Sequence, residues 1–249
     1  GSVTDGSAAL TGLLVALVLP GGLPIWMGIL GSIVGISIGK QIFGGLGFNF
    51  FNPALVGRAF LMASFPKAMT TWDWKPMALD WKVFELTSGA TPLASQAEVG
   101  AAGSGLNYID LFLGKVGGCI GETSVAALVL GFLYLLYKGY VDWRIPVSYL
   151  GSVALLTTFL GSRGPVFHIL AGGVVIGALF MATDMVTTPV TKKGRWIFGL
   201  GCGLLTVLIR IYGGYPEGTS YAILLMNMFV PLIDQYTFPR VYGEVKANG

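Results

Sequence analysis

The stretch Gly44-Gly45-Leu46-Gly47-Phe48-Asn49-Phe50-Phe51-Asn52-Pro53 interrupts an otherwise apolar region and decides what kind of fold the chain can adopt. Glycines, two asparagines and a proline in close succession do not continue a helix. At membrane depth such a break is tolerated only where the backbone is buried in protein or lines a cavity. Its free N–H and C=O groups can then hold a polar ligand. The stretch therefore predicts a broken membrane helix.

A new helix is expected directly after the break, over residues 54–65. Pro53 suits the first turn of a helix, and Asn52 is a favourable cap before it. Arg58 falls in the middle of this helix, where an arginine must pair, face a cavity or meet an anion. For Asn49 and Asn52, the alternative to ligand binding is simple capping and turn chemistry.

The composition of the whole chain predicts an integral membrane protein. Hydrophobic residues make up 54% of the sequence and charged residues 11%, and the mean hydropathy is +0.74. Soluble domains carry about a quarter charged residues. The net charge of +3 is dispersed, so no nucleic-acid partner is predicted. The two cysteines, Cys119 and Cys202, lack partners at metal-ligand spacing, so no metal site is predicted either.

Apolar segments long enough for membrane helices lie on both sides of the first break. The expected spans cover residues 24–43, 119–137, 146–160, 166–183, 196–211 and 221–233. Residues 7–19 are apolar but too short to span a bilayer, so they predict either a half-helix or the end of a span whose beginning is missing. A second polar break follows at residues 184–189. Two breaks, one in each half, suggest internal repeats around a central site.

Three carboxylates at or near membrane depth are candidates for an ion pathway: Glu122, Asp184 and Asp234. Ionisable residues inside a membrane are functional candidates by default. Glu122 falls one turn inside the expected span 119–137, where it can equally complement the dipole at the N-terminus of that helix. The alternative for Asp184 and Asp234 is a role as helix-end charges.

One long polar segment, approximately residues 66–108, carries the sequence Ser88-Gly89-Ala90-Thr91. Taken alone, these four residues are most simply a solvent-exposed turn. Tryptophan is typical of membrane interfaces, and Trp72, Trp74 and Trp81 predict that the segment lies along the membrane surface. The short loops 138–144 and 192–195 are rich in Lys and Arg, which places them in the cytoplasm and Thr91 on the opposite face.

Several stretches together resemble the NqrB/RnfD family, which provides membrane subunits of ion-pumping redox complexes. They are SGATPLA, GGLGFNFFNPALVGRAFLMASFP, MATDMVTTPVTKKGRWIFG and GGYPEGTSYAILLMNMFVPLIDQYTFPRVYG. The long C-terminal stretch resembles RnfD more than NqrB. The resemblance implies an all-α bundle of ten helices in two inverted repeats, similar to urea transporters. Relative to the family, the N-terminal helices are expected to be missing from this chain. The expected parts are the remainder of a first membrane repeat with its broken helix (residues 1–65), the extracytoplasmic surface segment (residues 66–118), and a second membrane repeat with a short cytoplasmic tail (residues 119–249).

The resemblance also implies two flavins. FMN is expected as a phosphoester on Thr91, within the motif of Ser88, Gly89 and Ala90, made by a separate flavin transferase. That transferase usually meets an aspartate where this chain has Glu85. A non-covalent riboflavin is expected within the membrane.

We predict that the residues near this riboflavin are Asn49, Asn52 and Arg58. The family resemblance further links carboxylates at the positions of Asp184 and Asp234 to cation uptake.

The implied activity is an electron relay in an ion-translocating (Na⁺ or H⁺) ferredoxin:NAD⁺ oxidoreductase of the bacterial inner membrane. The expected partners are the other Rnf proteins, RnfA, RnfB, RnfC, RnfE and above all the periplasmic flavoprotein RnfG, and membrane lipids. No dinucleotide fingerprint follows a strand, so the chain is expected to have no complete active site of its own. The alternatives are a channel or transporter for a small polar solute, the equivalent NqrB protein, or a structural subunit without cofactor.

Overall fold

A computed structural model describes residues 6–71, 108–114, 118–160, 164–213 and 218–239. All regular elements in these ranges are helical. The first group consists of α1 (Ser7–Leu17), α2 (Ile25–Ile36), the π-helical turn η1 (Ser37–Gln41), α3 (Pro53–Ser64) and α4 (Pro66–Thr70). The second consists of α6 (Tyr108–Leu113), α7 (Val125–Tyr137), α8 (Arg144–Leu160), α9 (Pro165–Leu170), α10 (Val174–Ile176), the π-helical turn η2 (Gly177–Met181), α11 (Lys192–Tyr212) and α12 (Thr219–Thr237).

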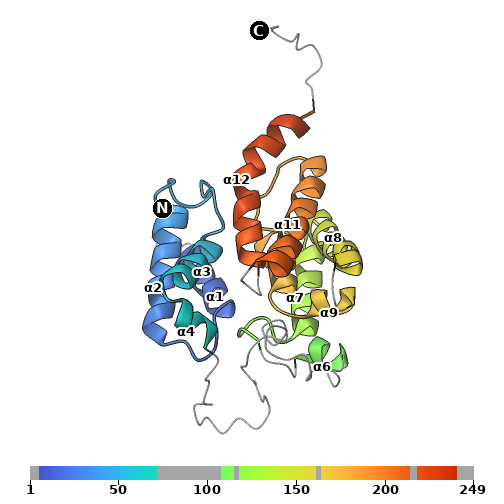
Figure 1. The fold of residues 1–249 in the computed structure, drawn as a ribbon. Helices are drawn as coiled ribbons and strands as arrows, with labels where there is room; N and C mark the ends of the chain where they lie inside the picture. Colours follow the sequence, from blue (N-terminus) through green and yellow to red (C-terminus); the bar gives the residue numbers. More distant parts are fainter. Residues whose placement is uncertain (1–5, 72–107, 115–117, 161–163, 214–217, 240–249) are drawn as a thin grey trace.

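The two groups lie side by side, and α12 lies at the boundary between them (Figure 1). Helix α12 packs against α11 in the second group and against α3 in the first. Figure 1 also shows α4 and α6 at one end of the molecule and the C-terminal end of α12 at the other. The N-terminus of α11 lies at the same end of the molecule as the C-terminus of α12, because the hydroxyls of Thr191 and Thr237 are hydrogen-bonded to each other.

The outward faces of the helices are apolar, as expected for contact with lipid. Helix α2 exposes one row of large side chains, Ile25, Ile29 and Ile33, and α11 exposes another, Ile197, Leu200, Leu204 and Leu208. Among the described residues, α11 is the one helix long and apolar enough to span a membrane by itself; α2 with η1, α3, α7 and α8 are shorter apolar helices. The expected all-helical architecture with broken helices is confirmed.

Small residues let the helices approach closely. In the second group, Gly199 and Gly203 of α11 lie against Ser148 and Ser152 of α8. In membranes, where lipid is as apolar as the protein surface, such close packing replaces the hydrophobic effect as the source of helix association. The two serine hydroxyls donate to carbonyls of their own helix, so they carry no unpaired group into the interface.

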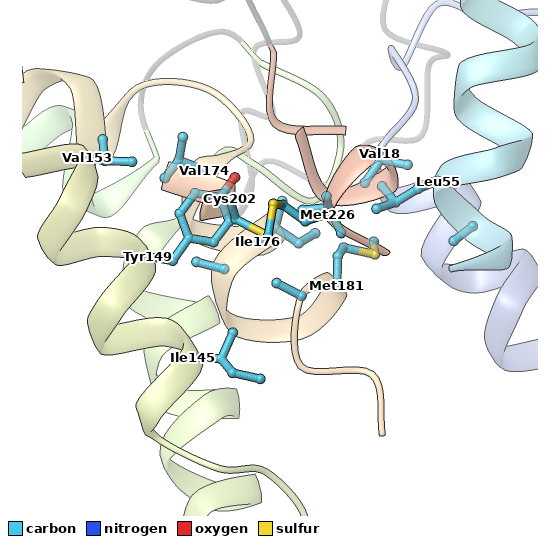
Figure 2. Close-up of a cluster of buried hydrophobic side chains, with 14 of the residues drawn as sticks. Val18, Leu55, Ile145, Tyr149, Val153, Val174, Ile176, Met181, Cys202 and Met226 are labelled. Carbon is cyan, nitrogen blue, oxygen red and sulfur yellow. The ribbon is translucent and has the colours of Figure 1, made fainter. Parts of the chain in front are cut away.

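The main core joins the two groups. Figure 2 shows Val18 and Leu55 of the first group beside Met181 and Met226 of the second, with Tyr149 and Cys202 deeper in the second group. The Tyr149 hydroxyl is hydrogen-bonded to that of Thr206 at 2.6 Å, which satisfies it inside the core.

One predicted span, residues 166–183, is wrong as a continuous helix. The chain forms α9, stops at Ala171, and resumes with α10 and η2. Gly172 has a φ of 72°, in the left-handed region that glycine adopts without strain. Arg210 of α11 stabilises this interruption, because its guanidinium donates to the carbonyls of His168 and Ala171 at the end of α9. The Arg210 side chain thus satisfies carbonyl groups at the end of a half-helix that stops inside the protein.

The packing of α8 on α11 predicts a sharp difference between two glycines. A Cβ at Gly199 would lie 2.8 Å from the Ile145 carbonyl oxygen, whereas a Cβ at Gly151 on α8 would meet nothing within 4 Å. Overpacking of this kind costs about 1–3 kcal/mol, so Gly199→Ala should lower the thermal stability of the purified protein. Gly151→Ala serves as the control and should be neutral or slightly stabilising. Equal effects at both positions would contradict the packing.

Candidate functional site

The two chain breaks meet in the interior of the molecule. Asn52 caps α3, because its Oδ1 accepts hydrogen bonds from the N–H groups of Ala54 (3.0 Å) and Leu55 (3.3 Å). Its Nδ2 donates to the carbonyl of Met181, the last residue of η2, at 3.1 Å. The predicted cap at Asn52 and the predicted start of the helix at Pro53 are confirmed. The same amide also ties the first break to the start of the second.

Asn227 of α12 makes the second link and was not predicted from the sequence. Its side chain is buried, with 1% of the residue exposed. With the amide oriented to satisfy both of its ends, Oδ1 accepts from the N–H of Asn52 at 3.2 Å. Its Nδ2 then donates to the carbonyls of Thr187 (3.2 Å) and Ile223 (3.3 Å). A single polar residue within the apolar part of α12, residues 222–233, was the available sequence signal.

Asn49 and Asp184 lie close together across the two breaks. The Asn49 Nδ2 is 3.5 Å from Asp184 Oδ2 and 3.4 Å from the Phe51 carbonyl oxygen, so both contacts are long. Thr187 donates its hydroxyl to the same carboxylate oxygen at 3.3 Å. A carboxylate, a hydroxyl, an amide and a backbone carbonyl therefore converge at one place, contributed by both halves of the chain.

Arg58 and Glu122 form a buried ion pair, in which Arg58 Nη1 lies 3.2 Å from Glu122 Oε1. Only 5% of Arg58 and 6% of Glu122 is exposed. The predicted span 119–137 begins too early: α7 starts at Val125, after its cap Ser124, and Glu122 lies in the loop before it. This loop also donates backbone hydrogen bonds from Ile120 and Gly121 to carbonyls at the C-terminal end of α1. A Cβ at Gly173 would collide with the Glu122 carboxylate, so the glycine allows the approach. The pair therefore joins α3 to the second group.

The third candidate carboxylate, Asp234, lies near the end of α12. Both of its oxygens accept from the N–H of Val190, at 3.1 and 3.3 Å, at an exposed position. Asp234 is thus separate from the Asn49–Asp184 contact, although it binds Val190, directly after the break that contains Asp184.

A charged cluster that was not predicted lies next to Val190. Asp142 accepts from the Arg144 guanidinium at 2.7 Å and from that of Arg195, which also donates to the Pro189 carbonyl. Burial alone would raise the pKa of Asp142, but hydrogen bonds from the Arg144 backbone and from both arginine side chains outweigh it and hold the pKa below its usual range. Asp142 and Arg195 are 53 positions apart, so no motif in the sequence indicated that they would pair.

The flavin-attachment candidates Ser88, Gly89, Ala90 and Thr91 lie outside the described residues, and so does Glu85. The described elements that flank their segment, α4 and α6, lie at the end of the molecule opposite the Asp142–Arg195 cluster (Figure 1).

These observations define an all-helical membrane protein in which two broken helices meet around buried polar groups. Its sequence settles the class further. The chain belongs to the NQR2, RnfD, RnfE family, whose model matches residues 1–243. The predicted resemblance to RnfD is confirmed.

Its relatives are subunits of ion-translocating redox complexes. The chain is 50% identical to the D subunit of the Na(+)-translocating ferredoxin:NAD(+) oxidoreductase complex of Acetobacterium woodii, over 99% of this chain and 76% of that protein. It is 51% identical to the D subunit of the proton-translocating ferredoxin:NAD(+) oxidoreductase complex of Clostridium ljungdahlii, over 97% and 76%. It is 40% identical to the D subunit of the ion-translocating oxidoreductase complex of Stutzerimonas stutzeri, over 96% and 76%.

The buried ion pair predicts strong coupling between Arg58 and Glu122. Removing one partner leaves a buried charge and costs about 3–5 kcal/mol, so Arg58→Met should destabilise the protein severely. Adding Glu122→Gln to that variant should recover part of the loss. Chemical unfolding midpoints of the wild type, both single variants and the double variant measure the coupling. Additive effects would show that the pair does not act as a unit.

Proposed function

We propose that the chain is the flavin-carrying electron-relay subunit of an ion-translocating ferredoxin:NAD⁺ oxidoreductase of the bacterial inner membrane. The observation that carries the proposal is its match to the D subunits of such complexes at about half identity along nearly the whole chain. The motif Ser88-Gly89-Ala90-Thr91 supports the covalent flavin. Ferredoxin and NAD⁺ are assigned to other subunits, and the flavoprotein RnfG on the outer face is the proposed redox partner.

Thr91 is the proposed attachment point for FMN. Its hydroxyl attacks the phosphoanhydride of FAD in the flavin transferase, the Oγ–P bond forms, AMP leaves, and a base of the transferase takes the proton. Gly89 and Ala90 leave room for that enzyme, and Pro92 stiffens the chain after the attachment point. A phosphoester tether leaves the ring system of the flavin available for one- and two-electron chemistry.

For the non-covalent riboflavin, the residues around Asn49 fit the ligand. The Asn49 amide makes only long contacts within the protein, so it can donate to and accept from the polar edge of a flavin ring. Phe43 and Phe50, with ring centroids 6.3 Å apart and partly exposed, offer apolar faces nearby. Asn52 uses both ends of its amide internally, and Arg58 faces Glu122. We therefore assign Asn52 and Arg58 to shaping the site and Asn49 to contact with the flavin.

The same arrangement supports an ion route through Asp184. Asp184, Thr187 and the Phe51 carbonyl supply oxygen atoms at the meeting point of both halves. Each half has a π-helical turn, then the break, then a helix: η1 before α3, and η2 before α11. This parallel supports inverted repeats like those of urea transporters. The relatives from Acetobacterium woodii and Clostridium ljungdahlii differ in the ion of their names, so overall similarity does not select Na⁺ or H⁺.

A channel or transporter for a small polar solute is the second candidate, because broken helices are also typical of transporters. It needs no flavin on Thr91. The third candidate, a structural subunit without cofactor, needs neither flavin nor solute uptake.

Covalent flavin should be visible after denaturation. The wild-type chain, coexpressed with a flavin transferase, should give a fluorescent band under ultraviolet light on a denaturing gel, and Thr91→Ala should give none. The matched control is Thr87→Ala, four residues upstream, which should keep full fluorescence. A dark wild-type band, with transferase present, would exclude covalent flavin; solute uptake into liposomes would then separate the transporter from the structural subunit.

Asp184, within the second break, and Asp234, which contacts Val190 directly after it, should differ in their effect on ion dependence. Asp184→Asn should raise the Na⁺ concentration needed for half-maximal turnover of the complex by tenfold or more, about 1.4 kcal/mol of lost binding. Asp234→Asn should change it less, because Asp234 lies away from the Asn49 contact. Initial rates against Na⁺ concentration measure both. An unchanged Na⁺ dependence in Asp184→Asn would reduce this residue to a helix-end charge. In a proton-translocating complex, the same variant should instead shift the pH profile.

A further inference from the structure

A cavity of about 730 Å³ lies beside the second break, at the end of the molecule opposite α4 and α6. The turn that joins α7 to α8 forms one wall, with Tyr140 and Trp143. The other wall is formed by residues of the second break, including Thr188, and by Val190 directly after it. The cavity is open on one side. Neither the redox relay nor the Asn49–Asp184 contact uses it.

The polar wall of this cavity carries excess positive charge. Arg144 and Arg195 both pair with the single carboxylate of Asp142, so the three groups together hold a charge of +1. Arg144 uses only part of its five N–H donors on Asp142. Lys192 and Lys193 are exposed and do not line the cavity, but they begin α11 close to Arg195 and add positive charge near the cavity.

Most of the remaining lining is aromatic and aliphatic, and Thr183 and Thr188 add two hydroxyl groups. Trp143 packs edge to face against Trp196 at 5.9 Å between ring centroids, and the Arg144 guanidinium lies 5.2 Å from the Trp143 ring. Tryptophan favours the level of lipid headgroups. Leu136 and Met185 also line the cavity, and Met185 is 78% exposed. A suitable occupant has an anionic group joined to an apolar body.

We propose that this cavity binds the headgroup phosphate of an anionic phospholipid. Basic pockets between helices at a membrane surface are typical sites for such headgroups. A free phosphate ion shares the charge chemistry but would leave the tryptophans and aliphatic side chains uncovered. Arg195 already links the α7–α8 turn to the second break, because it contacts both Asp142 and the Pro189 carbonyl, so a bound lipid should protect both segments.

The test is hydrogen–deuterium exchange on the assembled, delipidated complex. Phosphatidylglycerol should slow exchange in peptides covering residues 138–144 and 183–191, while a peptide covering residues 64–71 should not change. Phosphatidylcholine tests the need for a negative headgroup, and glycerol 3-phosphate tests the need for the acyl chains. Protection by phosphatidylglycerol alone is the expected result.

Variants locate the site. Arg144→Gln should weaken phosphatidylglycerol binding about fivefold, the contribution of one basic residue near an anionic lipid surface. Lys67→Gln, at the opposite end of the molecule, should leave it unchanged. If Arg144→Gln does not assemble, the exposed double variant Lys192→Gln/Lys193→Gln provides the same comparison. Equal protection by phosphatidylcholine or by glycerol 3-phosphate, or undiminished binding in these variants, would overturn the proposal.

Discussion

The amide of Asn52 is the interaction on which the rest of the structure depends. Two helices stop inside the protein, and each stop leaves backbone groups that lipid cannot satisfy, at a cost of several kcal/mol for each group. Asn52 caps α3 with its oxygen and holds the end of η2 with its nitrogen. Asn227 then accepts from the backbone N–H of Asn52 and donates to Thr187. Two buried amides thus satisfy backbone groups of both breaks and fix one break against the other.

The proposed riboflavin contact and ion route depend on that fixed geometry. Because the breaks are tied together, Asn49 from one half reaches Asp184 from the other. The ion pair of Arg58 with Glu122 provides a second connection between the helix groups, further along α3 from its cap. The polar groups at the meeting point therefore belong to neither half alone, as expected for a site between two repeats.

The individual helices of this fold were easier to predict from the sequence than the contacts between distant segments. Pro53 after Asn52 indicated a capped helix start, and the apolar segments indicated helices, because both signals are local. The interruption at Ala171 was not predicted, since the residues that close it include Arg210, 39 positions away. Asn227 and Asp142 were missed for the same reason: Asn52 and Thr187, which bind Asn227, and Arg195, which binds Asp142, come from distant segments. Pairing of Asn49 with Asp184 across 135 positions likewise needed the structure. The flavin motif was recognised by family resemblance, and spacing alone could not distinguish it from a turn.

The mass of the proteolytic peptide that contains Thr91 tests the central claim most directly. The account predicts that this peptide, isolated from the native complex, carries the mass of FMN less one water, and that fragmentation places the addition on Thr91 rather than on Thr87 or Ser88. An unmodified peptide from a complex with full electron-transfer activity would contradict the account, because electrons would then pass without the proposed carrier.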